Sequence, residues 1–298
     1  MRKIAIISDV HALLEPLEAV LEDMKKRGIT EIYSLGDNIG VGPNPSEVLE
    51  LLERYDVKSV RGNSEEYCLL GHEAFDYFNQ QKKLSQNWTL SKLSEEQLKR
   101  LKLFPVFYEL VLGGKKIALC HFANDIRIDY RYDHSVWEYQ DKIKNQLPFP
   151  SEQFRYTNSP EQKRVIALKC DYLRSRLAKE GNNPVLLAEL NALLSATNEP
   201  LFDGQTIDTY DEVIQGHVHY KLEDFSLEPP VHTIHALGIA YNDDEPADLA
   251  SYVVLNETET GYEMEEILVP FDRDKMLMAI ENSDMPDKSQ IKRFVRAI

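Results

Sequence analysis

The sequence of 298 residues has few cysteines, no long apolar run and no excess of positive charge. Its three cysteines, Cys68, Cys120 and Cys170, have no paired spacing, so we expect reduced thiols in a cytoplasmic protein rather than a disulfide framework. No apolar run approaches the length of a membrane span, and the run over residues 4–7 is too short for a secretory signal. The net charge of −16 argues against binding to nucleic-acid duplexes or anionic membranes.

The first 65 residues alternate between strand-like and helix-like patterns. Apolar runs of strand length occupy 3–7, 29–35 and 57–60. Between them, apolar residues recur at helical spacing over 14–24, ahead of Gly28, and again over 45–55, behind Asn44 and Pro45. This βαβαβ order predicts an α/β fold with parallel strands.

The remaining segments are predicted from similar patterns. Residues 66–103 are predicted to be helical, and Ser94 with Gln97 forms a capping-box pattern. We expect strands at 115–120 and 212–215, and a hairpin or meander that includes 252–255 and 265–269.

Residues 122–204 differ from the rest in composition. They carry 11 basic against 12 acidic residues, a net charge of −1, whereas the remainder carries 23 against 38, a net charge of −15. Aromatic and basic residues interleave there, and helix-like patterns cover about 160–180 and 184–196. We therefore predict one main domain over 1–121 and 205–298 and an inserted, mostly helical cap over 122–204.

Polar residues with metal-ligating side chains follow five of the predicted strands. In a parallel α/β sheet the carboxyl ends of the strands line one crevice, where ligands bind. Residues two apart on an extended backbone point to the same side. The side chains of Asp9 and His11, and likewise those of His217 and His219, should therefore point to the same side. The seven candidates are Asp9, His11, Asp37, Asn63, His121, His217 and His219.

This mixture of carboxylate and imidazole ligands favours transition metals over magnesium or calcium. An aspartate can bridge two ions, and a pair of ions suits the displacement at a phosphoryl group. Each residue also has an ordinary structural explanation: Asp9 as a helix cap, Asp37 and Asn63 as turn residues, and His121 as a core histidine. The order of all five blocks, each behind a strand, favours the metal site.

The blocks Asp9-x-His11, Gly36-Asp37, Gly62-Asn63, His121 and Gly216-His217-x-His219 resemble those of the calcineurin-like metallophosphoesterases. The segment Gly40-Val41-Gly42-Pro43-Asn44-Pro45 is similar to one in small bacterial phosphodiesterase-like members.

This resemblance implies a four-layer α/β/β/α sandwich with two divalent transition metal ions. Manganese is favoured, with iron or zinc as alternatives. It assigns Asp9, His11, Asp37 and His219 to one ion, and Asp37, Asn63, His121 and His217 to the other. It also implies that Asp37, Asn63 and His121 take part in catalysis.

Four positions depart from the family pattern. Ser64 stands where many relatives have a histidine beside the asparagine, and Ala12 stands where a glycine is usual. Phe122 replaces a glycine or alanine, and 235–238 replaces an Asn-Pro-Gly-Ser segment. These changes affect the contacts to the substrate, whereas every metal-ligand position is intact. We expect ordinary structural roles for His72, His134, His232 and His235, with His134 and His235 the strongest exceptions.

The resemblance implies hydrolysis of phosphodiesters or nucleotide polyphosphates, including dinucleoside polyphosphates, by a metal-bound hydroxide. The alternatives are a phosphomonoesterase or protein phosphatase, and a catalytically weak regulator that binds metal or nucleotide. The expected partner is a small, nucleotide-like phosphorylated substrate, and no pattern indicates a particular oligomeric state. The arginines and aromatics of the cap could hold phosphate and stack on a base, or could serve the cap's own core and surface.

Overall fold

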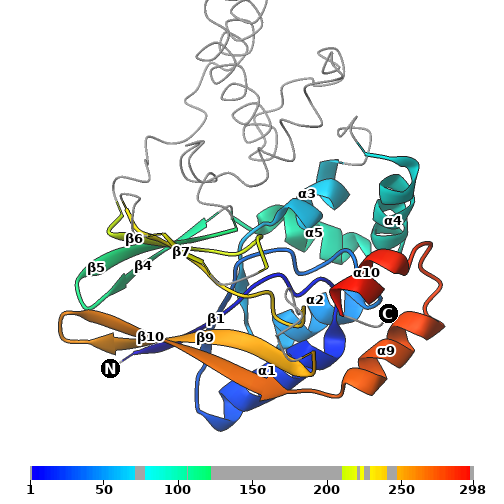
Figure 1. Cartoon of the computed structure of the whole chain (residues 1–298). Helices are drawn as coiled ribbons and strands as arrows, with labels where there is room; N and C mark the ends of the chain where they lie inside the picture. Colours follow the sequence, from blue (N-terminus) through cyan, green and yellow to red (C-terminus); the bar gives the residue numbers. More distant parts are fainter. Residues whose placement is uncertain are drawn as a thin grey trace, which may run out of the picture. The chain divides into compact units, whose positions relative to one another are not determined.

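The computed structural model describes residues 2–70, 78–105, 107–121, 210–219, 222–224, 229–239 and 247–295 (Figure 1). One compact unit comprises Met1–His121 together with Tyr210–Ile298. The predicted cap, its two helix-like segments, Cys170, His72 and His134 lie outside the described residues, so the domain division stays a prediction. None of the described helices is long and apolar enough to cross a membrane.

The first sheet contains the predicted parallel strands. Strands β1 (Lys3–Ile7), β2 (Glu31–Ser34) and β3 (Lys58–Ser59) pair in parallel, in the order β10-β9-β1-β2-β3. Strands β9 (Leu249–Thr258) and β10 (Gly261–Pro270) form an antiparallel hairpin that joins β1 through β9. The prediction of an α/β fold is confirmed, and the predicted hairpin is present with longer strands.

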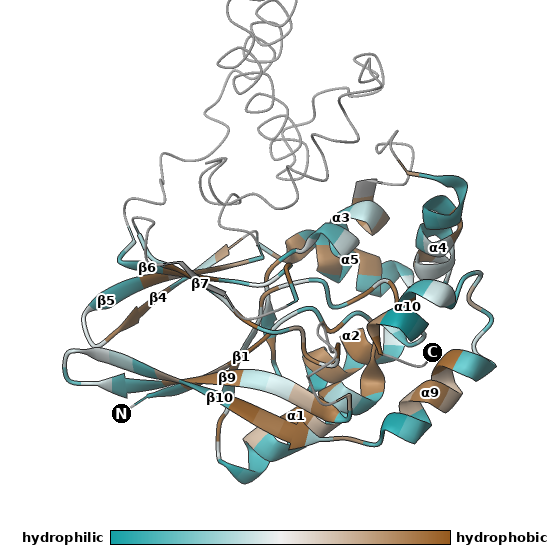
Figure 2. Cartoon of the chain, in the orientation of Figure 1, coloured by the Kyte–Doolittle hydropathy of each residue, from teal (hydrophilic) through white to brown (hydrophobic). Residues whose placement is uncertain are grey.

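Two amphipathic helices connect the parallel strands. Helix α1 (Leu14–Lys26) buries Leu17, Val20 and Met24, and it ends before Gly28, which has a φ of +70°. Helix α2 (Pro45–Arg54) begins with proline in its first turn, as predicted, although the Asn44 side chain makes no capping hydrogen bond. Their apolar faces pack with one face of the first sheet in a common core, and Figure 2 shows hydrophobic colouring on both helices.

The second sheet has the order β4-β5-β6-β8-β7. Its strands are β4 (Phe107–Leu112), β5 (Lys115–Cys120), β6 (Glu212–Gln215), β7 (Leu222–Asp224) and β8 (Val231–Thr233), and β5, β6 and β8 run parallel. Ile6 of β1 and Leu35, which directly follows β2, belong to a core cluster with Leu119 and Ile214 of the second sheet. In the described residues, helices α1 and α2 therefore pack on one face of the first sheet, and the second sheet packs on its other face.

Five further helices complete the described fold. Helices α3 (Asn63–Leu70), α4 (Gln80–Ser91) and α5 (Glu95–Leu103) occupy the region predicted to be helical, and the Ser94–Gln97 capping box is present. The sequence analysis did not predict the C-terminal helices α9 (Arg273–Asn282) and α10 (Ser289–Phe294). Apolar residues of both helices pack against Leu13, which is two residues from His11, and against Ala236, whose backbone N–H donates to the His219 carbonyl oxygen at 3.2 Å.

Candidate metal centre

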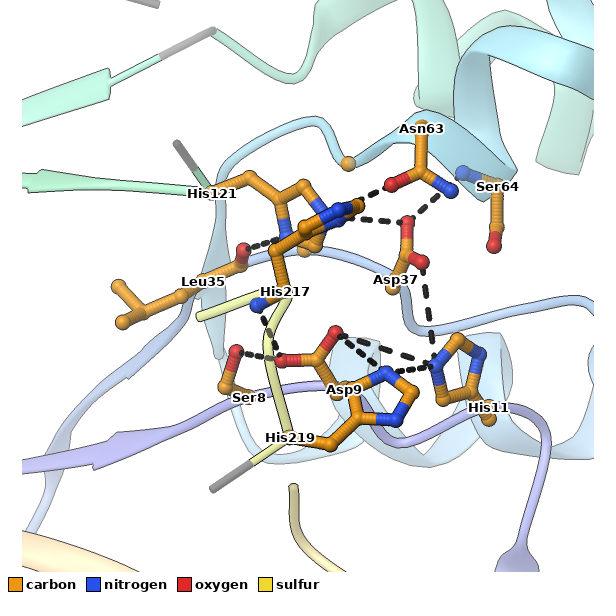
Figure 3. A network of polar contacts seen from close by, with 12 residues as sticks. Ser8, Asp9, His11, Leu35, Asp37, Asn63, Ser64, His121, His217 and His219 are labelled. Atoms are coloured by element: carbon orange, nitrogen blue, oxygen red, sulfur yellow. Dashed lines mark hydrogen bonds and ion pairs between the residues drawn. The ribbon is translucent and has the colours of Figure 1, made fainter. Parts of the chain in front are cut away.

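The structure brings the seven predicted ligands together where five strands end (Figure 3). Asp9 and His11 follow β1, Asp37 follows β2, Asn63 begins α3 directly after β3, His121 follows β5, and His217 and His219 follow β6. The side chains form two groups, and Asp37 lies between them. The strand ends therefore meet as the parallel topology predicted.

The first group consists of Asp9, His11 and His219. The Nε2 atoms of His11 and His219 lie 2.9 Å apart. Asp9 Oδ1 lies 3.8 Å from His11 Nε2 and 3.4 Å from His219 Nε2. The other oxygen, Asp9 Oδ2, accepts hydrogen bonds from Ser8 Oγ at 2.5 Å and from the His217 backbone N–H at 2.8 Å. Asp9 is thus oriented through Oδ2, and Oδ1 faces the two imidazoles.

The second group consists of Asn63, His121 and His217. His121 Nε2 lies 3.0 Å from both Asn63 Oδ1 and His217 Nδ1. Asp37 connects the groups, because its Oδ1 lies 3.6 Å from His121 Nε2 and its Oδ2 lies 3.8 Å from His11 Nε2. This placement, with one oxygen toward each group, suits an aspartate that bridges two ions.

The tautomer of His121 follows from its backbone partner. His121 Nδ1 lies 2.8 Å from the carbonyl oxygen of Leu35, which can only accept, so Nδ1 carries the proton. In the neutral ring Nε2 is then an acceptor, yet it faces the acceptor oxygen of Asn63. A cation between two facing acceptors resolves this arrangement, and a carbonyl-bound second nitrogen is the usual support of a ligating histidine.

Burial and neighbouring imidazoles keep His11 and His217 neutral near pH 7. Desolvation lowers the pKa of His11 to about 4, and the neighbouring His219 acts in the same direction. Desolvation, together with His121, lowers the pKa of His217 well below its ordinary value. Burial alone would raise the pKa of Asp9, but the adjacent His219 imidazole, whose Nε2 lies 3.4 Å from Asp9 Oδ1, brings it below its ordinary value. At pH 7 His11 and His217 therefore offer neutral nitrogens and Asp9 offers ionised oxygens, the forms that metals require.

The backbone at the centre is strained. Eight non-glycine residues among those described have a positive φ, and five of them are predicted ligands. These five are Asp9, His11, Asp37, His217 and His219, with φ between +49° and +69°. Such residues are uncommon and cluster at functional sites, because the surrounding structure must offset the strain.

Two glycines permit the strand ends to approach one another. A Cβ at Gly62 would lie 2.3 Å from both the backbone nitrogen and Oδ1 of Asp37. A Cβ at Gly216 would lie 1.9 Å from Ser8 Oγ and 2.7 Å from Asp9 Oδ2. Real Cβ contacts are longer, so any side chain at either position would displace a ligand or its support.

Sequence reasoning missed two residues that contact the ligands. Glu65 is fully buried in the first turn of α3, and its carboxylate accepts backbone hydrogen bonds around Asp37 and Gly62. Burial and the charge of Asp37 raise the pKa of Glu65 to about 7. Phe294, at the end of α10, packs edge-to-face on the His219 ring with centroids 5.6 Å apart. The acidic residues that follow Gly62-Asn63 could have indicated a role for Glu65. Phe294 is 75 residues from His219 in the sequence, so no local pattern connects the two.

Ser64, which replaces a histidine of many relatives, is buried at the start of α3. Its backbone N–H donates to Asp37 Oδ1 at 2.7 Å. A Cβ added at Gly40 would lie 3.2 Å from Ser64 Oγ, so the side chain lies close to the Gly40 loop. The contact that Ser64 makes with the centre is thus a backbone contact.

Two other described histidines pair with glutamates. His232 Nε2 lies 3.3 Å from Glu212 Oε2, and His235 Nδ1 lies 2.5 Å from Glu266 Oε1. The ordinary role expected for His232 agrees with this pairing. His235 was one of two expected exceptions, and its partner is a carboxylate of β10.

Residues 2–147 match the model of the calcineurin-like phosphoesterase superfamily domain. This match confirms the resemblance drawn from the sequence and assigns those residues to a superfamily of phosphoester hydrolases. An uncharacterised protein of Methanocaldococcus jannaschii is 42% identical over 136 residues. That similarity covers 46% of this chain and 53%, about half, of the length of that relative.

Two solved structures have a similar fold. A hypothetical protein from Pyrococcus horikoshii OT3 is 16% identical with a TM-score of 0.60, covering 99% of this chain and 98% of that one. A metallophosphoesterase from Sphaerobacter thermophilus is 20% identical with a TM-score of 0.56 and the same coverage. At these identities the comparison establishes the fold.

Proposed function

We propose that this chain, which contains a calcineurin-like phosphoesterase superfamily domain over residues 2–147, is a hydrolase with a binuclear metal centre. The observation that carries the proposal is the convergence of seven nitrogen and oxygen ligands in two groups joined by Asp37. Two subsets of these residues place their ligand atoms within 4.8 Å of one another: Asp9, His11 and His219, and Asp9, Asp37 and His121.

The residues fit a pair of metal ions on their own chemistry. Asp9 Oδ1 is buried and has no hydrogen-bond partner among the described residues. A buried carboxylate oxygen without a partner is unfavourable unless a cation neutralises it. Two histidine nitrogens, His121 Nε2 and His217 Nδ1, and the amide oxygen of Asn63 meet within hydrogen-bond distance, although His121 offers only a lone pair on that side.

The ligand division is the one that the resemblance implies. Asp9, His11 and His219 would hold one ion, Asn63, His121 and His217 the other, and Asp37 both. Imidazole with carboxylate ligands favours manganese, iron or zinc, and we propose manganese. When bound, two such ions supply a hydroxide near neutral pH and stabilise the charge of a phosphoryl displacement.

The protein's own residues orient the proposed metal ligands through hydrogen bonds. The Leu35 carbonyl fixes the tautomer of His121, and Ser8 Oγ fixes the carboxylate of Asp9. The Ser64 backbone N–H donates to the bridging Asp37. Such outer contacts set the orientation and basicity of the ligands, so the described residues prepare the site before any substrate binds.

The proposed substrates are phosphodiesters or nucleotide polyphosphates, including dinucleoside polyphosphates. Ser64 stands where a histidine could protonate the leaving group, and a serine hydroxyl is too weak an acid for that role. Esters whose leaving group departs as a stabilised anion, such as a nucleotide phosphate, should therefore be preferred. The net charge of −16 makes the metal ions the main attraction for an anionic substrate. A cytoplasmic location and the role of the cap in binding substrate are part of the same proposal.

Hydrolysis of a bis(p-nitrophenyl) ester with added Mn²⁺, compared with the p-nitrophenyl monoester, tests the proposal. We expect the diester to be hydrolysed faster. His217→Gln should abolish most of that activity, whereas His232→Gln, a matched change at a histidine paired with Glu212, should preserve it. Preference for the monoester would indicate a phosphomonoesterase. Metal binding without turnover of either ester would indicate a regulator and would refute the proposed activity.

A further inference from the structure

Glu65 connects the two loops that carry Asp37 and Asn63. Its side chain is fully buried, and both oxygens accept hydrogen bonds from backbone N–H groups. Oε2 accepts from Asp37 at 3.0 Å and from Gly62 at 2.8 Å. Oε1 accepts from Asn38 at 2.8 Å and, more weakly, from Ile39 at 3.4 Å.

These donors lie where the regular pairing of the sheet has ended. The register of β2 with β3 ends at Ser34 and Ser59, and the left-handed conformation of Asp37 turns its loop away from a ladder. A buried backbone N–H needs an acceptor, and the two oxygens of the Glu65 carboxyl group supply acceptors on both sides. Glu65 therefore supplies the hydrogen-bond acceptors that strand pairing would otherwise give to the two loops that carry Asp37 and Asn63.

The first turn of α3 also holds the Asp37 side chain, through the Ser64 N–H at 2.7 Å. The backbone and the carboxylate of Asp37 are thus both fixed by residues that directly follow Asn63. Metal ligation tolerates small errors in ligand position only, so this contact sets how far Asn63 lies from Asp37.

We infer that Glu65 is a positioning residue that sets the second half of the metal centre, which needs Asp37 and Asn63 together. This inference rests on the proposed binuclear centre and adds an outer residue to it. The first half has Asp9, His11 and His219, which Glu65 does not contact in the hydrogen bonds of the described residues. Loss of Glu65 should therefore affect the two halves unequally.

Glu65→Gln is the sharpest substitution, because it keeps the shape and removes half of the acceptors. An amide offers one oxygen, and its NH₂ would face backbone N–H groups that need an acceptor. Glu65→Asp keeps both acceptors on a shorter chain and should restore part of the loss. Glu15→Gln is the matched control, since Glu15 is a buried glutamate in the first turn of α1 and pairs with Lys275.

Calorimetric titration of metal-free protein with Mn²⁺ gives the readout. We expect two binding events in the wild type, and in Glu65→Gln a weakening of the event that needs Asn63 by about 10–100-fold, with a clearly smaller weakening of the other, which shares only Asp37. Glu15→Gln should retain both affinities. Two unchanged events in Glu65→Gln, or equal weakening of both, would overturn the inference. Fewer than two events in the wild type would instead refute the binuclear centre.

Hydrogen exchange in metal-free protein tests Glu65 independently of metal binding and of activity. The amide hydrogens of Asp37, Asn38 and Gly62 should exchange slowly in the wild type and about tenfold faster in Glu65→Gln. Glu65→Asp, which keeps its carboxylate, should fall between them and serves if Glu65→Gln fails to fold. Rapid exchange of these amides in the wild type would overturn the role of Glu65 whatever the metal content.

Discussion

The two halves of the metal centre are supported by different means. In the first half, Ser8 orients Asp9 and the Phe294 ring packs on His219, so a hydroxyl and a C-terminal aromatic give the support. In the second half, the Leu35 carbonyl orients His121 and the buried Glu65 holds the loops of Asp37 and Asn63. Asp37 belongs to both. A substitution at a residue that supports one half should therefore weaken metal binding mainly in that half, whereas a substitution at Asp37 should weaken both.

Replacement of Asp37 should have the largest effect. Asp37→Asn keeps the volume and removes the negative charge that would be shared by two ions, so we expect diesterase activity to fall by at least about 100-fold. Both metal affinities should fall together. A variant that lost one ion and kept the other at full affinity would show that Asp37 does not bridge, which elemental analysis after dialysis would reveal.

Lowering the pH should reduce the stability of the metal-free protein through His11, a ligand of the first half. Burial lowers the pKa of His11 to about 4. The unfolded chain therefore takes up a proton below about pH 6.5, while the folded chain does so only near pH 4, and stability falls as pH falls through that window. The His11 contribution lost at pH 5 is about 2 kcal/mol.

Urea unfolding of metal-free wild type and His11→Asn at pH 7.5 and pH 5 measures this contribution. The difference between the two proteins isolates His11 from Glu65, whose raised pKa changes stability in the opposite direction between its ordinary value and about 7. An equal change with pH in both proteins would show that His11 is not the source.

Removal of the aromatic support should have a smaller effect. Phe294→Leu keeps an apolar side chain and loses the ring contact with His219, which is worth about 0.5–1.5 kcal/mol. We expect a modest loss of thermal stability and a few-fold weakening of the metal held by Asp9, His11 and His219. If the weakened ion is the one held by Asn63 and His121, the assignment of supports is wrong.

The smallest effect is expected at Ser64. Its contact with Asp37 is a backbone hydrogen bond, which alanine retains. Ser64→Ala should therefore change the rate of diester hydrolysis by no more than a few-fold, which steady-state kinetics will measure. A complete loss of turnover with both ions still bound would assign the hydroxyl a direct part in the reaction.

The sequence predicted those features that depend on local order along the chain. Apolar periodicity predicted β1 and α1, and the polar residues behind each strand predicted the convergence of the seven ligand positions, because parallel strands end at one edge. The sequence did not predict the left-handed backbone at Asp9 or His219, because tertiary contacts impose it. The contact of Phe294 with His219 joins distant segments, and no local pattern in α10 indicates it.

Elemental analysis of metal-loaded wild-type protein, combined with electron paramagnetic resonance of its manganese, tests the central claim most directly. Seven ligands joined through Asp37 predict two ions per chain with a spectrum of an exchange-coupled pair, because one carboxylate would connect them. A content of one ion or none, or two ions without coupling, would contradict the proposed binuclear centre.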